Sequence, residues 1–202
     1  MTIKVFIVGY IQTNCYVVFS QQQKEAAIID PGGGYNRISA FLKSVDKIPA
    51  AVLLTHGHFD HTLAAAKFQK DGAKIYIHSA DNEMAGAKQG LASKFGLCVP
   101  KLVPDILFED QEIIKVGDIE FKVIHTPGHS KGSSCFVCQD CIFSGDTLFF
   151  ESYGRTDFYG GSMTEMAKSL KKLFDLPGDY KVYPGHGEST SLSHERIHNP
   201  LA

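Results

Sequence analysis

The chain has 202 residues, of which 44% are hydrophobic and 21% charged, and its formal net charge is −2. This composition is typical of a globular protein, and the small negative charge gives no bulk attraction for nucleic acid or an anionic membrane. The apolar runs are far shorter than the roughly 20 residues that span a bilayer, and the first residues do not have the pattern of a signal peptide. The five cysteines are an odd number, which argues against a disulfide framework. We therefore expect a cytoplasmic protein without nucleic-acid or membrane partners.

The first half of the chain alternates strand and helix patterns. Short β-rich runs predict strands over residues 3–8, 14–20, 25–30, 50–54 and 73–81. Apolar residues at helical spacing predict helices over residues 35–46 and 63–72. The third strand ends in Asp30 before a turn of proline and three glycines. Residues 82–101 are helical or irregular, and the pattern does not decide between the two.

The second half adds two predicted hairpins and one amphipathic helix. The hairpins turn at Gly117-Asp118 and at Gln139-Asp140, and the helix lies within residues 160–179. A last strand follows within residues 180–187, and the remaining residues read as a polar tail. Since strands and helices alternate without a linker or repeat, we expect one α/β domain over residues 1–202.

Four predicted strands run directly into histidine or aspartate. Ligands of α/β sheets collect outside the carboxyl ends of the strands, so these side chains are expected to meet at one edge. The candidates are His56, His58, Asp60, His61, His129, Asp146 and His186. A single histidine of this kind is more often a surface or core residue than a ligand, but the joint pattern favours a metal site. Imidazoles and carboxylates together suit a divalent ion, zinc first, with iron or manganese as alternatives.

The spacing within "HGHFDH" indicates two metals. In extended backbone His56 and His58 point to the same side, whereas Asp60 and His61 lie where a helix begins and point elsewhere. The small Gly57 between the first pair lets the chain turn tightly. Asp146, alone after its strand, is the natural bridging carboxylate. Two ions about 3.5 to 4 Å apart would share a hydroxide, because they lower the pKa of water toward about 7.

These motifs carry a family resemblance. "THGHFDH", "TPGHS", "SGD" and "PGHG" resemble, in order and spacing, the signature of the metallo-β-lactamase superfamily. The resemblance implies a four-layer αββα sandwich with a dinuclear site on one edge. It assigns the first metal to His56, His58 and His129. It assigns the second metal to Asp60, His61 and His186, with Asp146 as the bridge.

Further motifs narrow the resemblance to one branch. "NCYVV", "IDPGG", "GDTLF", "GRTDF" and "HERIHNP" are similar to the glyoxalase II-like branch, that is, hydroxyacylglutathione hydrolases and their short single-domain relatives. This implies a hydrolase that cleaves a small-molecule thioester such as S-lactoylglutathione. Asp60 would orient the attacking hydroxide or take its proton. The resemblance implies that Arg155 contacts the substrate, and Phe158 and Tyr159 are expected to line the same pocket.

Several other functions stay open at this point. The same scaffold and motifs occur in persulfide dioxygenases, in which His58, His129 and Asp146 would hold one iron. An ester or a lactone could replace the thioester. A nuclease, an antibiotic-inactivating lactamase and a non-catalytic metal-binding module are weaker alternatives, because the chain has no basic stretch, no signal-peptide pattern and an intact ligand set.

Three cysteines on one predicted hairpin are expected to have a structural role. Cys135, Cys138 and Cys141 alternate with apolar residues on a hairpin, so we expect two packed thiols and one that faces solvent. Cys138 and Cys141 would lie opposite each other across the turn, where a disulfide is geometrically conceivable but disfavoured in a reducing cell.

The remaining polar residues are expected to support the site or to lie at the surface. Thr55 either hydrogen-bonds a ligand or only ends its strand. His78 and His125 pack or support ligands, with His125 the stronger candidate for support because it precedes His129 closely. His194 and His198 are expected at the surface or docking the tail.

Overall fold

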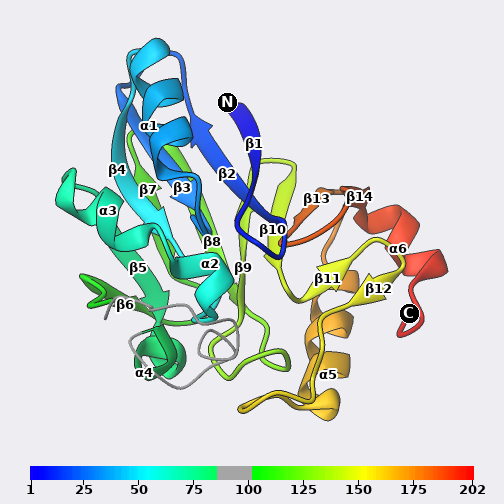
Figure 1. Cartoon of the computed structure of the whole chain (residues 1–202). Helices are drawn as coiled ribbons and strands as arrows, with labels where there is room; N and C mark the ends of the chain where they lie inside the picture. Colours follow the sequence, from blue (N-terminus) through cyan, green and yellow to red (C-terminus); the bar gives the residue numbers. More distant parts are fainter. Residues whose placement is uncertain (86–101) are drawn as a thin grey trace.

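Two six-stranded sheets form the framework of the computed structural model, which describes residues 1–85 and 102–202 (Figure 1). The first sheet contains β1 (Thr2–Val8), β2 (Thr13–Phe19), β3 (Glu25–Ile29), β4 (Ile48–Leu53), β5 (Lys74–His78) and β6 (Ile106–Phe108). The second contains β7 (Ile113–Val116), β8 (Ile119–His125), β9 (Ser134–Cys138), β10 (Cys141–Gly145), β13 (Lys181–Pro184) and β14 (Thr190–Ser191). A separate hairpin pairs β11 (Leu148–Phe149) with β12 (Ser152–Tyr153).

Helices lie between and after the strands. They are α1 (Tyr35–Ser44), α2 (Phe59–Thr62), α3 (Ala65–Lys70), the 3-10 turn η1 (Ser79–Asp81), α4 (Asn82–Ala85), α5 (Met163–Phe174) and α6 (Leu192–His198). In the first sheet, β3, β4, β5 and β6 run parallel to one another. In the second sheet, β10 and β13 are parallel and are connected through α5.

Three apolar cores separate four layers. The middle core packs the two sheets together, with Val18 and Leu53 from the first sheet against Phe121 and Phe136 from the second. The strand β2 is buried along its whole length, because its alternate side chains enter the middle core and the outer core under α1 and α3. Such doubly buried strands need an apolar residue at nearly every position. The resulting order of helices, sheet, sheet and helices confirms the expected αββα sandwich.

The helix α5 illustrates how the outer layers are held. Ser162 caps its first turn by accepting a hydrogen bond from the backbone N–H of Glu165 (3.3 Å). Met166, Leu170 and Leu173 are fully buried against the second sheet. Each such side chain stabilises the fold by about 1.5 to 3 kcal/mol relative to an exposed position. This packing holds α5 on the face of the sheet that contains β10 and β13, the two paired strands that it connects.

The structure corrects two expectations and confirms a third. The polar tail is not irregular, since it forms β14 and α6. Cys135, Cys138 and Cys141 are all buried free thiols, so none of them faces solvent. Cys138 and Cys141 do lie opposite each other in the β9–β10 hairpin, as expected.

Part of one expectation lies outside the described residues. Asn82–Ala85 form a helix, and the rest of the segment expected to be helical or irregular, residues 86–101, is outside that range. Within residues 1–85 and 102–202, no helix combines the length and the apolar character that a membrane crossing requires.

Candidate metal centre

All the sequence-predicted ligands meet at one edge of the sandwich, where strands of both sheets end. The loop after β4 carries His56 and His58, and α2 follows it with Asp60 and His61. From the second sheet, β8, β10 and β13 lead to the other ligand positions. These are His129, Asp146 and His186. Side chains that are up to 130 positions apart in the chain (56 to 186) are therefore brought together by strand order alone.

The turn between the first two histidines depends on a close backbone approach. A Cβ on Gly57 would lie 2.9 Å from Met84 Cβ and 3.0 Å from the backbone nitrogen of Ala85. The Gly57 N–H donates to Asp81 Oδ2 (2.9 Å). His58 then has extended backbone and precedes the first turn of α2. Glycine is needed here because η1 and α4 pack directly on the ligand loop.

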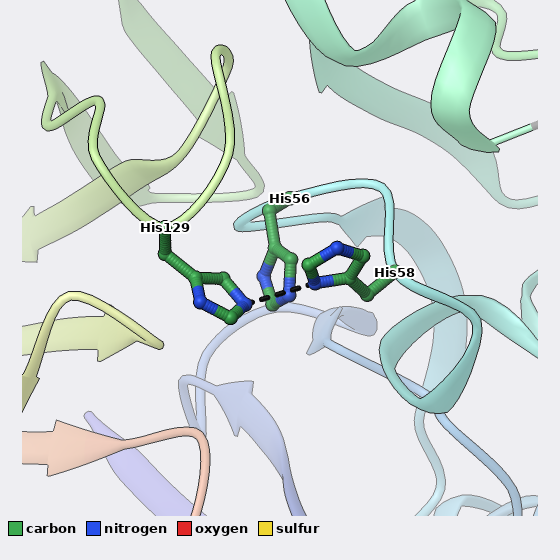
Figure 2. Close-up of side chains that lie close together, drawn as sticks. All are labelled: His56, His58 and His129. Atoms are coloured by element: carbon green, nitrogen blue, oxygen red, sulfur yellow. Dashed lines mark hydrogen bonds between the residues drawn. The ribbon is translucent and has the colours of Figure 1, made fainter. Parts of the chain in front are cut away.

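Three imidazoles form the first group of ligands. His58 Nδ1 lies 2.8 Å from His129 Nε2, and the ring of His56 lies 4.8 Å from each of their rings, centroid to centroid. Figure 2 shows the three rings turned toward a common point. One nitrogen from each ring lies within 4.8 Å of the other two, so a single ion could contact all three.

The second group combines a carboxylate with two imidazoles. Asp60 Oδ2 lies 3.4 Å from His61 Nε2 and 3.3 Å from His186 Nε2. Four ligands about 2.0 Å from one zinc ion in a tetrahedron lie about 3.3 Å from one another, so these separations fit a shared ion.

Asp146 lies between the two groups. Its Oδ1 is 3.4 Å from His61 Nε2 in the second group, and its Oδ2 is 3.4 Å from His129 Nε2 in the first. Oδ2 also lies 3.7 Å from His186 Nε2 in the second group. The carboxylate therefore has oxygens close to both groups, where it could bridge two metals.

Buried atoms without a partner support metal binding independently. Within the described residues, His56 Nε2, His61 Nε2 and Asp146 Oδ1 are buried and have no hydrogen-bond partner. Buried polar atoms in native proteins almost always have a partner, and losing one costs about 1 to 3 kcal/mol. All three atoms point into the groups described above. A cation in each group would satisfy them, so the residues fit a dinuclear centre.

A hydrogen-bonded chain behind the ligands fixes which nitrogens face the centre. Thr55 Oγ1 donates its one proton to Asp30 Oδ2 (2.7 Å), so His56 Nδ1 must be the donor in its contact with Thr55 Oγ1 (3.0 Å). His61 Nδ1 donates to the same Asp30 carboxylate (2.9 Å). In their neutral forms, both histidines would therefore present an unprotonated Nε2 for metal binding. The hydrogen bond between Thr55 and a candidate ligand, one of the two expected roles of Thr55, is present. The role of Asp30 was not predicted from the sequence.

The loop that carries His129 has its own support. His129 Nδ1 donates to the backbone carbonyl of Arg155 (2.7 Å), which leaves Nε2 for the metal. The buried Asp81 accepts hydrogen bonds from Ser130 Oγ (2.6 Å) and the Gly132 N–H (2.6 Å). His125 Nε2 donates to the Lys131 carbonyl (2.8 Å), so it supports this loop and not His129 itself.

Charge divides the centre into a neutral side and a charged side. Burial and the neighbouring His129 lower the pKa of His58 to about 4, and burial with His61 lowers the pKa of His56 well below its usual value. Burial would also lower the pKa of His61, but Asp146, Asp60 and Asp30 outweigh it and raise that pKa well above its usual value.

In the charged side, burial and neighbouring charges also have opposite effects on the pKa values of His186 and Asp60. Burial opposes a charge on His186, yet its hydrogen bond to Asp60 raises the pKa of His186. Burial would raise the pKa of Asp60, and the neighbouring His61 and the hydrogen bond from His186 instead hold it far below its usual value. Without metal, protons on these histidines thus balance the carboxylates, and a divalent cation would take over that role.

Of the residues expected to contact substrate, Phe158 lies beside the first group, Arg155 packs on Phe158, and Tyr159 is exposed to solvent. The Phe158 ring is 5.8 Å from the ring of His58 and 6.2 Å from that of His129. The Arg155 guanidinium carbon lies over the Phe158 ring, 4.2 Å from its centroid. Arg155 also forms a two-bond ion pair with Asp157 (3.0 and 2.8 Å). Tyr159 is 84% exposed, and the Lys131 ammonium lies 5.9 Å from its ring. Lys131 makes no ion pair within the described residues.

Comparisons with known proteins cover nearly the whole chain. The profile of the Metallo-beta-lactamase superfamily matches residues 8–186. Hydroxyacylglutathione hydrolase GloC of Haemophilus influenzae is 34% identical over 208 residues, which cover 100% of this chain and 98% of that protein. The crystal structure of BLEG-1 B3 metallo-beta-lactamase superposes with a TM-score of 0.92 at 37% identity, covering 99% of both chains. TTHA1623, solved in a di-iron-bound form, gives 0.87 at 35% identity, covering 98% of this chain and 100% of that one.

Proposed function

Because the chain belongs to the metallo-beta-lactamase superfamily, we propose that it is a dinuclear metallohydrolase that cleaves a thioester such as S-lactoylglutathione. The superfamily binds divalent metals, and the observation that carries the proposal is the position of Asp146, with carboxylate oxygens close to both ligand groups. The thioester follows from similarity to the hydroxyacylglutathione hydrolase GloC. Zinc is the first choice of metal, and the di-iron form of TTHA1623 keeps iron as a second.

The two ligand groups would hold the metals, which supply a Lewis acid for the substrate carbonyl and a water of lowered pKa. The chain itself supplies a carboxylate that would orient the water. Asp60 Oδ2 is within 3.4 Å of the Thr13 hydroxyl, and the neighbouring His61 and His186 hold the pKa of Asp60 far below its usual value. Asp60 is therefore ionised at neutral pH, and the oxygen that does not face the second ligand group can accept a hydrogen bond from the attacking water. A thiolate leaves readily, so no strong general acid is required.

Phe158 and the two cations near it would bind the rest of the substrate. The Phe158 ring forms an apolar wall directly beside His58 and His129. Arg155 is compensated by Asp157, whereas Lys131, beside the neighbouring Tyr159, has no ion-pair partner among the described residues. A carboxylate on the thiol moiety, as glutathione carries, would pair with Lys131 first and with Arg155 after it exchanges partners.

A hydrolysis panel on protein of measured metal content tests the proposal. We expect S-lactoylglutathione to be hydrolysed faster than a neutral thioester of the same acyl group, and Lys131→Ala to raise KM with little effect on kcat. Lys115→Ala, which removes a lysine that pairs with Glu120 on β7–β8, is the matched control. Preference for a neutral ester or lactone, with no effect of Lys131→Ala, would reject the thioester while leaving the metallohydrolase intact.

The same experiments test two further candidate functions, each of which is favoured by one comparison. The similarity to BLEG-1 B3 metallo-beta-lactamase favours a β-lactam, which is an acyl substrate for the same attack. Structural similarity to ETHE1 from Myxococcus xanthus, with a TM-score of 0.83 at 28% identity, favours the oxygenase alternative, in which His58, His129 and Asp146 hold one iron. Hydrolysis of a β-lactam instead of the thioester would establish the first candidate. Oxygen uptake with a glutathione persulfide, by protein that holds one iron per chain, would establish the second.

A further inference from the structure

A second cluster of potential metal ligands lies on α6, away from the centre described above. Residues 194–198 read His-Glu-Arg-Ile-His and form the last five residues of this helix. In a helix, residues four apart lie on the same face, so His194 and His198 are neighbours. Their ring centroids are 4.4 Å apart. The same spacing with a glutamate after the first histidine holds zinc in one class of metalloproteases, in which the glutamate acts as the base.

The glutamate of this motif has a structural role instead. Glu195 is completely buried and accepts the Glu151 N–H on both carboxylate oxygens (3.1 Å each). It also accepts from Thr190 Oγ1 (2.7 Å) and from Asn199 Nδ2 (2.9 Å). With its acceptor sites occupied, Glu195 cannot serve as a base toward solvent. It instead ties α6 to the turn between β11 and β12.

The hydrogen bonds from the Glu151 N–H to Glu195 place a third potential ligand, the Glu151 carboxylate, beside the histidines. Glu151 has a left-handed backbone (φ 47°), a conformation that glutamate rarely adopts, and its N–H is held there by Glu195. Its side chain turns outward, and Glu151 Oε1 lies 3.1 Å from His194 Nε2. The Phe150 ring stacks on His194 (5.1 Å, 12°) and fixes the plane of the imidazole. The ligand atoms of these three residues are not all within 4.8 Å of one another in the structure. Binding therefore requires the exposed ring of His198 to turn a nitrogen toward the His194–Glu151 pair.

We propose that His194, His198 and Glu151 form a peripheral binding site for a divalent transition metal. Two imidazoles and one carboxylate suit zinc, nickel or copper, with solvent completing the coordination. As an exposed ion pair alone, Glu151 and His194 would stabilise the fold very little, so stability does not explain the arrangement. A bound ion would join α6 to the β11–β12 turn. That hairpin follows Asp146 directly, and its Phe149 ring lies 6.3 Å from the ring of His186.

Nickel titration of the untagged, zinc-loaded protein tests this site. We expect one divalent ion per chain more than before after gel filtration, counted by elemental analysis, and retention on immobilised nickel. His198→Gln should weaken nickel binding at least tenfold, and Glu151→Gln should weaken it less. Ile197→Ala is the control, because this side chain is 75% exposed on the same helix and should leave binding unchanged.

The other histidines should not add to the number of metal ions counted per chain. Five belong to the metal centre, His78 is buried, and His125 Nε2 is bonded to a backbone carbonyl. Because total metal is counted, exchange of nickel for zinc in the centre would not raise the count. A count that stays constant, or a nickel affinity that His198→Gln and His194→Gln leave unchanged, would overturn the proposal.

Discussion

Asp30 organises the centre although it contacts no proposed metal. Its carboxylate accepts hydrogen bonds from the Thr55 N–H (2.8 Å), the Thr55 hydroxyl and His61 Nδ1. Through Thr55 it also determines which nitrogen of His56 carries the proton. One buried side chain therefore orients a ligand of each group, and its loss should affect both.

We expect Asp30→Asn to weaken metal binding about 10- to 100-fold, because the amide cannot accept from all three donors. The backbone should tolerate the change, since Asp30 has φ 51° and asparagine adopts this conformation readily. Asp46→Asn is a matched control, with a similar φ of 54° and only an exposed partner, Lys24. Calorimetric titration with zinc measures both. Unchanged affinity in Asp30→Asn would show that the ligands are oriented without it.

The metal-free protein should lose stability as the pH rises above about 6.5. The pKa values of His61 and His186 are raised in the folded chain, so both bind a proton there more tightly than in the unfolded chain. Their contribution is complete below the ordinary histidine pKa and disappears as the pH passes through the raised values. Thermal unfolding across this range, with and without zinc, measures the effect. Equal pH dependence of both forms would contradict it.

The convergence of the candidate ligands could be predicted from the sequence, whereas most of their supports, apart from Thr55, could not. Each ligand stands beside glycine or another ligand just after an apolar run, which is a recognisable pattern. Asp30 precedes proline and glycine and so reads as a turn residue, and Asp81 follows a strand and precedes a segment with no clear period. A buried carboxylate is identified by its partners, and these come from distant parts of the chain. Only the tertiary structure supplies them.

At the scale of elements, short loops hold the ligands at the strand ends. The loop after β13 approaches Asp146 so closely that a Cβ on Gly185 would lie 2.3 Å from Asp146 Oδ1 and 2.8 Å from His61 Cε1. The Gly185 N–H donates to the carbonyl of Gly145 (2.8 Å), which joins the ends of β10 and β13. The side-chain volume at this position is therefore limited by the ligands themselves.

Gly185→Ala should abolish most metal binding while the chain still folds. The added methyl group must displace Asp146 or His61, and both belong to the centre. Gly178→Ala is the control: it has φ 84° and open space around its Cβ, so it should cost about 1 to 2 kcal/mol of stability without affecting the metals. Metal content by elemental analysis separates the two effects. Full metal content in Gly185→Ala would mean that the loop can move aside.

Long elements were predictable, and very short ones were not. The helix over 35–46 and the hairpin turning at Gln139-Asp140 appear as predicted, because their apolar periods extend over several residues. The strands β11 and β12 have two residues each, too few to show a period. The helix α6 buries only Leu192 and Glu195, so its sequence resembles a solvated tail. Its position depends mainly on hydrogen bonds, from the Glu151 N–H to Glu195 and from Arg196 to the carbonyls of Phe174 and Gly178, because Leu192 is its one apolar side chain in the core.

At the scale of the whole molecule, the centre joins the two sheets at their shared edge. His56, His58 and His61 follow a strand of the first sheet, whereas His129 and His186 follow strands of the second. Each ligand group combines residues from both sheets. Bound metals would therefore act as cross-links between the two halves of the sandwich, in addition to the apolar core between them.

Removing the metals with a chelator should lower the melting temperature by on the order of 10 °C. An ion present at about 1,000 times its dissociation constant stabilises the folded state by about 4 kcal/mol, and for a chain of this size each kcal/mol corresponds to about 2 to 4 °C. Calorimetry before and after dialysis against chelator measures the change, and re-addition of zinc is the control for irreversible damage. A melting temperature that does not depend on metal would show that the sheets need no cross-link.

The order of the strands has a consequence during synthesis. Every strand of the first sheet lies within residues 2–108 and every strand of the second within residues 113–191, so the first sheet can pair before the second has left the ribosome. Until then its inner face, with Val18, Ile29 and Leu53, has nothing to pack against. Nascent chains stalled after the first sheet should therefore recruit chaperones and aggregate, and this hazard should end once β8 and β9 cover that face. Metal can be captured only afterwards, since each ligand group needs a residue from the late half.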